Sequence, residues 1–272
     1  MIPDKLTADY SENYEVSIRL MPDGFSFWGY IPAEKDSFFK ETFFFDHELP
    51  VVDALKRIIF ENPCFSYTYR SFHVICVSEK YTLAADHVFV EQQKERLFAF
   101  CHQADRSLKV IAQPVNALNT FILFGIDEEV YAFLMRSLVN PVFVHSLSLL
   151  LLAGHKRSVA VSRKLMHVAI HKSTIDVLCI EHGDLLFLNS YGYDTGSDIL
   201  YYIMYICKQT GFNQLDDYLT ISGNQARCQP VLSIVNKYIK QVDYLQPVLD
   251  GYQVALNDEP PLDVIALIKC GS

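Results

Sequence analysis

Charge is scarce in this sequence, and positive charge is scarcer than negative charge. Of the 272 residues 20% are charged, the formal net charge is −9 at pH 7, and no stretch is rich in Lys or Arg. An acidic surface repels phosphate backbones, so this composition argues against nucleic-acid binding. Half of the residues are apolar, which argues against overall disorder, because disordered chains lack the apolar surface that offsets ordering entropy. We expect a folded protein of about two domains.

Long apolar runs are also missing. The longest, at 147–154, is interrupted by Ser148, whereas a membrane span needs roughly 20 apolar residues. The first residues are polar and acidic, and they lack the basic segment and apolar core of a secretory signal. The seven cysteines are scattered without a Cys-x-x-Cys pair, and those in apolar runs, such as Cys76, resemble small core hydrophobes. This usage predicts a reducing, cytoplasmic location, with no membrane span.

The sequence does contain one order of elements that occurs twice. The order is a β-hairpin, a third strand, a helix and a fourth strand, and the two copies begin about 150 residues apart, a domain-sized spacing. We predict the first copy at 15–21, 25–31, 39–46, a helix opened by Pro50 and 71–78, and the second at 165–171, 175–181, 184–190, a helix capped by Ser197 or Asp198 and ended by Gly211, and 218–222.

Strands and helices also alternate between the two copies. We predict helices at 87–102, 128–138 and 146–156, strands at 108–114, 120–126 and 141–146, and a loop at 257–263 before the last element. This alternation favours mixed or parallel sheets covered by helices. The predicted fold is therefore α/β, with a first lobe at 1–146 and a second lobe at 147–272.

Several short patches resemble a known family. Ser173-Thr174, His182-Gly183, 185–187 and 195–198 fall at the intervals seen where the second domain of actin-like ATPases begins. Similarly, 121–152 resembles the segment that joins the two lobes of those proteins, and 221–224 resembles their adenosine motif. The chain is similar to the inner-membrane actin-like protein of type IV pilus machines, to the bacterial division actin, and to an uncharacterised bacterial family with an actin-like ATPase fold. The resemblance implies two RNase H-like lobes in an actin-like ATPase arrangement.

The phosphate loops of this family are degenerate here. The strand-end Asp of the family falls at Arg19 and Ala169, and its Gly falls at Met21 and His171. The Asp organises a Mg²⁺ ion through water, and the Gly lets backbone N–H groups approach phosphate oxygens. The residues at these four positions cannot fill either role. We therefore expect no cofactor, no ATP hydrolysis and weak or absent Mg·ATP binding. The alternative is bound ATP with Mg.

Two turns are the candidate nucleotide-binding positions. Lys172, Ser173 and Thr174 offer one ammonium and two hydroxyls to an anion, although an ordinary polar hairpin turn is the favoured interpretation of them. Ser222, Gly223 and Asn224 open a helix and match the adenosine motif, although a helix N-cap with a tight bend is the alternative. We predict no metal site at His167 and His171, because four residues along a strand span roughly 13 Å. We also predict no catalytic residue.

Acidic and aromatic clusters have simpler alternatives. Asp184, Asp194 and Asp198 suggest phosphoryl transfer or RNase H-like cleavage, but they occupy a strand start, a loop and a cap, and neither first strand clearly carries the acid that nuclease chemistry needs. The tyrosines at 191–205 are interpreted as flanking a half-buried helix. Five phenylalanines crowd 38–45, and strand alternation cannot bury all of them on one face, so we predict an exposed aromatic patch there.

These features favour a non-catalytic actin-like protein that acts as a protein-interaction or scaffold module, with a lost or weak nucleotide site and an unidentified protein partner. The enzyme alternative is an ATPase or kinase whose phosphate loops are remodelled. A nuclease is the third and least favoured hypothesis. Fold and sequence identify neither the partner nor the pathway, because function resides in sites rather than in folds.

Overall fold

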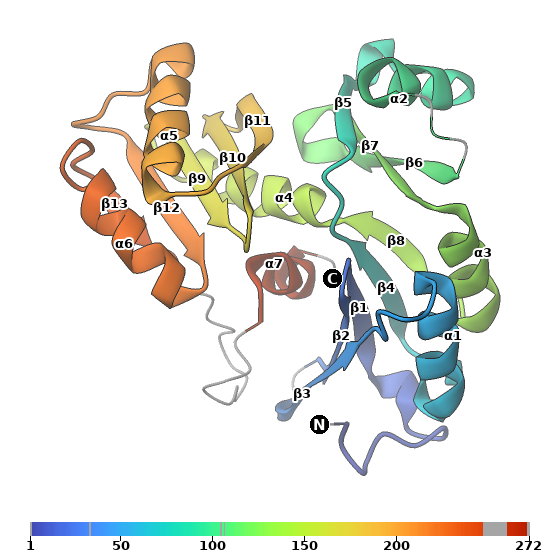
Figure 1. Ribbon diagram of the computed structural model, residues 1–272. Helices are drawn as coiled ribbons and strands as arrows, with labels where there is room; N and C mark the ends of the chain where they lie inside the picture. Colours follow the sequence, from blue (N-terminus) through green and yellow to red (C-terminus); the bar gives the residue numbers. More distant parts are fainter. Residues whose placement is uncertain (1, 33, 104, 106, 247–259, 271–272) are drawn as a thin grey trace. The chain divides into compact units, whose positions relative to one another are not determined.

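The computed structural model describes residues 2–32, 34–103, 105, 107–246 and 260–270, and the chain divides into two compact units (Figure 1). The first unit contains residues 2–114 and 119–148. The second unit contains residues 115–118, 149–246 and 260–270. Each unit is organised around its own five-stranded sheet.

The larger sheet of the first unit mixes antiparallel and parallel pairs. The elements up to residue 145 are η1 (Ser11–Asn13), β1 (Glu15–Met21), β2 (Gly24–Ile31), β3 (Glu34–Phe44), α1 (Val51–Glu61), η2 (Pro63–Ser66), β4 (Ser71–Cys76), β5 (Tyr81–Ala85), η3 (Asp86–Val88), η4 (Glu91–Gln93), α2 (Lys94–His102), β6 (Leu108–Val115), η5 (Asn116–Leu118), β7 (Thr120–Asp127), α3 (Glu128–Ser137) and β8 (Val142–His145). The sheet has the order β3-β2-β1-β4-β8, with β4 parallel to β1 and β8 parallel to β4. A smaller sheet, β5-β7-β6, packs against α2.

The sheet of the second unit repeats this plan. Its elements are α4 (Ser146–Val159), β9 (Leu165–Ile170), β10 (Thr174–Glu181), β11 (Asp184–Gly192), α5 (Gly196–Thr210), β12 (Tyr218–Gly223), α6 (Gln225–Val235), β13 (Val242–Tyr244) and α7 (Leu262–Cys270). The order is β11-β10-β9-β12-β13, with β12 parallel to β9 and β13 parallel to β12. In both sheets the first strand of a hairpin therefore lies between its antiparallel partner and the parallel fourth strand. The repeated order of elements predicted from the sequence is confirmed.

Two local predictions were only partly right. β3 begins at Glu34 rather than 39, because Ile31 pairs with Glu34 and the Ser37 hydroxyl accepts a hydrogen bond from the Ile31 N–H at 2.7 Å. Only Lys94–His102 of the helix predicted at 87–102 is α-helical; before it, the Phe89 ring stacks on Phe121 of β7 and holds the chain along the small sheet.

The predicted loop at 257–263 lies partly outside the described residues. Of its residues, 257–259 are not described, and α7 already begins at Leu262.

Helix ends follow local sequence signals. The hydroxyl of Thr195 accepts a hydrogen bond from the Asp198 N–H while the Asp198 carboxylate accepts one from the Thr195 N–H, which is a complete capping box for α5. The cap is therefore Thr195, with Asp198 as its third-position partner, and not Ser197. α5 ends where predicted, at Gly211, whose φ of 64° places it in the left-handed region favoured by glycine.

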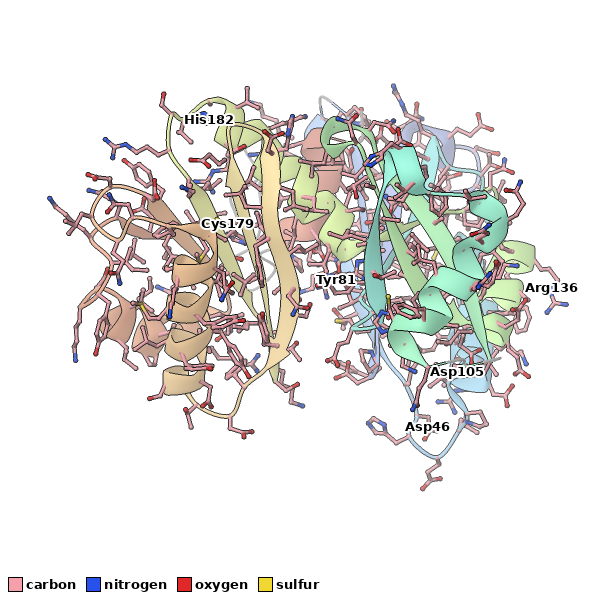
Figure 2. The ribbon with its side chains drawn as sticks, turned by 90° about the horizontal axis from the view of Figure 1, so that it is seen from above. Asp46, Tyr81, Asp105, Arg136, Cys179 and His182 are labelled. Carbon is pink, nitrogen blue, oxygen red and sulfur yellow. The ribbon has the colours of Figure 1, made fainter. Side chains whose placement is uncertain are left out.

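The two faces of the second sheet are covered differently. Met166, Val168 and Ile170 of β9 face the apolar cluster formed by α5 and α6. The alternate residues Leu165 and His167 face the side where α4 and α7 lie. Cys179 is inside the apolar cluster, whereas His182 lies at the exposed turn between β10 and β11 (Figure 2).

The cysteines serve as core residues. Among those whose side chains the structure describes, six are free thiols, and all except Cys101 are buried. Burial raises the pKa of the Cys76 thiol to about 12, so the group is neutral at physiological pH. The interpretation of Cys76 as a small core hydrophobe is confirmed. Within the described part of the chain, no helix is both long enough and apolar enough to cross a bilayer.

Candidate functional site

The two first hairpins end in turns of the same length. Met21 pairs with Gly24 across the β1–β2 turn, and the His171 N–H donates to the Thr174 carbonyl at 2.9 Å across the β9–β10 turn. Each turn therefore contains two residues, and His171 occupies the position in its hairpin that Met21 occupies in the other. Counting back along each strand equates Ala169 with Arg19. This register confirms the inference from the two hairpins that Arg19 is equivalent to Ala169 and Met21 to His171.

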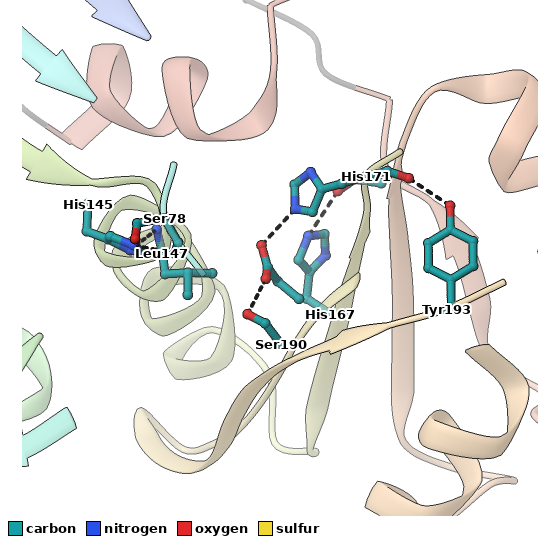
Figure 3. A network of polar contacts seen from close by, with 9 residues as sticks. Ser78, His145, Leu147, His167, His171, Ser190 and Tyr193 are labelled. Atoms are coloured by element: carbon teal, nitrogen blue, oxygen red, sulfur yellow. Dashed lines mark hydrogen bonds and ion pairs between the residues drawn. The ribbon is translucent and has the colours of Figure 1, made fainter. Parts of the chain in front are cut away.

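The His171 side chain is tied to the sheet of its own unit. Its Nε2 lies 2.7 Å from Oδ2 of Asp176, and Asp176 also accepts a hydrogen bond from the Ser190 hydroxyl (Figure 3). The Tyr193 hydroxyl donates to the His171 carbonyl at 2.7 Å. The His171 side chain is one-third exposed and the Asp176 side chain is largely buried. An imidazole and its bound carboxylate thus stand where the resemblance implies a glycine.

His167 is a second, separate polar centre on the same strand. Its Nδ1 lies 2.9 Å from the Thr220 hydroxyl and its Nε2 lies 3.1 Å from the Ser222 hydroxyl, both on β12. The Thr220 hydroxyl can donate to the Met166 carbonyl, which leaves its oxygen free to accept a hydrogen bond from the Nδ1–H of His167. The Ser222 hydroxyl can then donate to Nε2, so these partners fit a neutral imidazole ring. Burial, helped by the nearby Arg157 charge and opposed by the Asp176 carboxylate, lowers the pKa of His167 to about 3. This histidine is uncharged at neutral pH.

The two histidines bind different partners, and metal-ligand clusters are not evident. The described residues contain no group of three or more His, Cys, Asp or Glu side chains placed to hold a metal ion. Of the acidic residues singled out from the sequence, Asp194 contacts Asp198 through its backbone, because its N–H donates to the Asp198 carboxylate at 3.1 Å. Asp184 pairs with Glu181 at the start of β11, and the Asp198 carboxylate is occupied at the N-terminus of α5, where the Thr195 N–H bond lowers its pKa.

The residues proposed to bind an anion lie on the exposed β9–β10 turn. Lys172 and Ser173 are exposed, and the Lys172 ammonium has no hydrogen-bond or ion-pair partner among the residues that the structure describes. Thr174 is half-buried and begins β10. The Ser173 carbonyl accepts a hydrogen bond from the Tyr193 N–H at 3.1 Å, which anchors the turn to the end of β11.

The second candidate group lies at the end of the neighbouring strand. Gly223 of β12 pairs with Ile170 of β9, so Ser222, Gly223 and Asn224 lie at the same sheet edge as the β9–β10 turn. A Cβ on Gly223 would lie 2.4 Å from the Ile170 carbonyl oxygen, so glycine is required here by strand packing. The Ser222 hydroxyl is buried against His167, and the Asn224 side chain makes no capping bond to α6.

Aromatic side chains form an exposed patch only in part. Of the five phenylalanines at 38–45, Phe44 is 72% exposed, Phe39 and Phe45 are buried, and the other two are half-buried. Phe44 ends β3, which is an edge strand of its sheet. The patch predicted from strand alternation therefore centres on one exposed ring.

One feature of the second unit was not predicted from the sequence. A pocket of about 290 Å³ lies between α4, β9, β10 and α7, with His167 among its lining residues. The lining residues extend from Leu150 to Lys269. Local hydrophobic periodicity carries no information about contacts between residues so far apart in the sequence. The one indication of this pocket in the sequence was a histidine inside an apolar strand.

Comparisons with known proteins agree on the fold. A protein of unknown function from Bacteroides thetaiotaomicron, with an actin-like ATPase fold, is 29% identical over 99% of this chain and 100% of its own, with a TM-score of 0.83. The solved PilM-PilN type IV pilus biogenesis complex contains a chain that is 10% identical over 94% of this chain and 96% of its own, with a TM-score of 0.56, which indicates a shared fold alone. No protein with a curated description matches this sequence.

These comparisons confirm the predicted α/β class and the predicted actin-like ATPase fold. The family described as "Protein of unknown function (DUF3822)" matches residues 3–242, which is most of the chain. The chain therefore belongs to the DUF3822 family, and it has the actin-like ATPase fold of the similar Bacteroides thetaiotaomicron protein of unknown function.

Proposed function

We propose that this chain is a non-catalytic actin-like protein that acts as a protein-interaction or scaffold module, with a lost or weak nucleotide site. The observation that carries the proposal is the His171–Asp176 pair at the β9–β10 turn. In actin-like ATPases, the resemblance implies a glycine here, whose missing side chain lets backbone N–H groups approach phosphate oxygens. A fixed imidazole fills that space, and its carboxylate partner adds negative charge.

The metal-organising position supports the same proposal. Ala169 is 6% exposed and pairs with Asp176 of β10 and Ser222 of β12. A methyl group offers no oxygen to Mg²⁺ or to its water ligands, and Mg²⁺ is bound by hard oxygen ligands. In the first unit the equivalent position is Arg19, a buried cation that cannot replace a carboxylate as a metal ligand.

The exposed Phe44 and the edge position of β3 support a role in protein interaction. An aromatic ring that is 72% exposed at the end of the outermost strand of the described sheet offers apolar area to a partner. PilM, which shares the fold, is known as part of a complex with PilN. That association belongs to PilM, and it supports only the idea that an actin-like fold can serve a protein partner.

The alternative function is an ATP-binding ATPase or kinase with remodelled phosphate loops. Its support is the exposed Lys172–Ser173 pair, which lies at the same sheet edge as Ser222, Gly223 and Asn224. An ammonium and a hydroxyl at a turn can bind a phosphate as a point charge and a donor. Against this alternative, the Ser222 hydroxyl is already bound to His167.

Calorimetric titration of the full chain with Mg·ATP separates the two functions. We expect no saturable binding or a millimolar Kd, because each lost charge-assisted hydrogen bond removes roughly 1.5–3 kcal/mol, and about 1.4 kcal/mol corresponds to a tenfold change in Kd. Phosphate release should equal that of buffer. A low-micromolar Kd, together with phosphate release abolished by Lys172→Ala, would establish the ATPase alternative.

Recovery of partners from the native host tests the interaction role. We expect the tagged chain to retain the same partner with and without Mg·ATP, and the Phe44→Ser variant to lose it. Phe100→Ser is the matched control, because Phe100 is 89% exposed on α2 of the same unit. If the Phe44→Ser and Phe100→Ser variants lost the partner equally, nonspecific hydrophobic binding would explain the result, and the proposed role of β3 would be contradicted.

A further inference from the structure

The pocket in the second unit has an apolar wall. It is enclosed by α4 and α7 against β9 and β10, and its volume is about 290 Å³. The wall residues that matter for the argument are Leu150, Ala153, Leu165, Leu178, Leu262 and Ile265. Protein interiors are packed almost as densely as organic crystals, so an unfilled space of this size between helices and a sheet is unusual. A ligand can occupy it.

Its size limits what it can hold. Sites for small molecules typically enclose roughly 300–1,000 Å³ and are lined mainly by apolar side chains with a few polar groups that orient the ligand. This pocket is at the lower end of that range, which suits one short apolar chain or ring. His167 adds no charge to the wall, because both of its ring nitrogens are bound to the hydroxyls of Thr220 and Ser222.

The charged residues of the pocket are all cations. Lys156 and Arg157 lie in the last turns of α4, and Lys269 lies near the end of α7. The Lys156 ammonium donates to the Lys269 carbonyl at 3.5 Å, which brings these two helix ends together. No acidic residue occurs among the lining residues that the structure describes, although the whole chain carries a net charge of −9. A cationic group of this kind on an acidic protein favours an anion.

We propose that this pocket binds a small amphipathic carboxylate of the medium-chain fatty acid class. The apolar chain lies against Leu165, Leu178 and Ile265, and the carboxylate lies at Arg157, with Lys156 and Lys269 beside it. A guanidinium is the appropriate principal contact because its planar fork matches both oxygens of a carboxylate. This site is distinct from the turn residues of the proposed function, so either proposal can fail without the other.

Calorimetric titration of the full chain with octanoate and with octanol tests the site. We expect octanoate to bind saturably, and octanol, which has the same chain length without the charge, to bind about tenfold more weakly. Arg157→Gln should weaken octanoate binding about tenfold, the effect of one charge-assisted hydrogen bond, and leave octanol binding unchanged. Lys208→Gln, an exposed cation on α5 at the other face of the sheet, is the matched control and should change neither affinity.

A filled pocket provides the second variant. Ala153→Leu places a larger side chain into the space from α4, and it should abolish binding of both ligands while the unfolding temperature stays within a few degrees of that of the wild type. The proposal would be overturned by a lack of saturable octanoate binding, by equal affinity for octanoate and octanol, or by equal loss of octanoate affinity in Arg157→Gln and Lys208→Gln. Octanoate binding that survives Ala153→Leu would overturn it as well.

Discussion

The two five-stranded sheets share one strand order but fill their cores with different chemistry. In the first unit, Phe27 contacts the rings of Phe39, Phe65 and Phe72 with centroids 4.9–6.3 Å apart. The core of the second unit is mainly aliphatic, and its opposite sheet face carries the buried His167. Strand order follows from the sequence of hairpin, strand and helix, whereas cores tolerate large changes of composition if their volume is kept.

The first hairpins differ in the same way. At the β1–β2 turn the side chain facing the strand end is the apolar Met21, whereas at the β9–β10 turn it is His171, held by Asp176. Both turns keep the two-residue length that the register requires. The two units thus share one backbone plan, while the side chains at equivalent positions of the first hairpin turn differ between them. The following predictions test how far the two units are equivalent.

The largest expected effect comes from the glycines at close strand contacts. A Cβ on Gly24 would lie 2.1 Å from the Phe43 carbonyl oxygen, and one on Gly223 would lie 2.4 Å from that of Ile170. We expect Gly24→Ala and Gly223→Ala each to lower the free energy of unfolding by about 3 kcal/mol, because backbone must move and φ is positive at both positions. Gly211→Ala, where nothing lies within 4 Å of the added Cβ, should cost about 1 kcal/mol.

Urea unfolding followed by fluorescence distinguishes the units, because the only tryptophan, Trp28, lies in β2 of the first unit. Gly24→Ala should move the Trp28 transition more than Gly223→Ala does, and circular dichroism should report both. Equal shifts of the Trp28 transition would contradict this expectation and would mean that the two units unfold together.

The next effect concerns the buried histidine, which belongs to the second unit alone. The pKa of His167 is lowered from 6.5 to about 3, so the unfolded chain binds a proton below pH 6.5 that the folded chain does not bind. Its contribution to stability is present above pH 6.5 and is lost as the pH falls toward 3. Between pH 7.5 and 5.0 we expect this residue to account for a loss of about 2 kcal/mol in the free energy of unfolding.

His167→Gln should reduce the pH dependence of unfolding by that amount, measured in urea at the two pH values. The matched control is His87→Gln, because His87 is exposed and lies in the first unit. A pH dependence unchanged in His167→Gln would show that the pKa of this histidine is the same in the folded and unfolded chains, and would contradict the lowered value.

Helix caps give a smaller effect. The Asp127 carboxylate accepts hydrogen bonds from the N–H groups of Glu129 and Val130 at the start of α3, and Thr195 caps α5. We expect Asp127→Ala and Thr195→Ala each to cost about 1 kcal/mol by urea unfolding. Asn224→Ala is the control, because Asn224 precedes α6 without a side-chain capping bond and should cost only a few tenths of a kcal/mol. If Asn224→Ala lowered the free energy of unfolding as much as Asp127→Ala and Thr195→Ala do, the absence of a side-chain cap at Asn224 would be contradicted.

Surface ion pairs should give the smallest effect. Lys164 lies 3.3 Å from Glu181 in the second unit, with its side chain only 18% exposed, whereas Lys56 and Asp53 in the first unit are 2.9 Å apart and well exposed. We expect Lys164→Gln to cost up to about 1 kcal/mol and Lys56→Gln less than about 0.5 kcal/mol, because solvent screens exposed pairs. Raising the salt concentration should reduce the cost of Lys56→Gln by a larger fraction than the cost of Lys164→Gln, because partly buried pairs are screened less. The reverse order of the two costs would contradict this account.

Much of the fold could be predicted from local patterns. Strands β1 and β9 were located because their apolar runs end at recognisable turns, and α5 was located between a cap and Gly211. Errors arose where tertiary contacts override local pattern. Ser37 extends β3 through its bonds to Ile31 and Glu34, and the stacking of Phe89 on Phe121 keeps that segment out of α2. Propensity within a segment cannot anticipate a partner from another element.

The sequence predicted where the candidate site lies, but not which hydrogen bonds its side chains make. The resemblance identified the β9–β10 turn and the end of β12, and the register places both at one sheet edge. It did not indicate that Ser222 is bound to His167, or that His171 is bound to Asp176. Each of these contacts joins residues on different strands, and which hydroxyl or carboxylate meets which ring depends on the strand register.

The sequence by itself determined the order of elements, the repeated plan and the α/β class, because hydrophobic periodicity and turn residues act over a few positions along the chain. Only the tertiary structure decided which polar groups are buried together and where space is left. His167 became a neutral, doubly bound residue, and the pocket beside it arose between α4, β9, β10 and α7. Such features depend on how side chains from distant segments pack, and packing is a property of the assembled core.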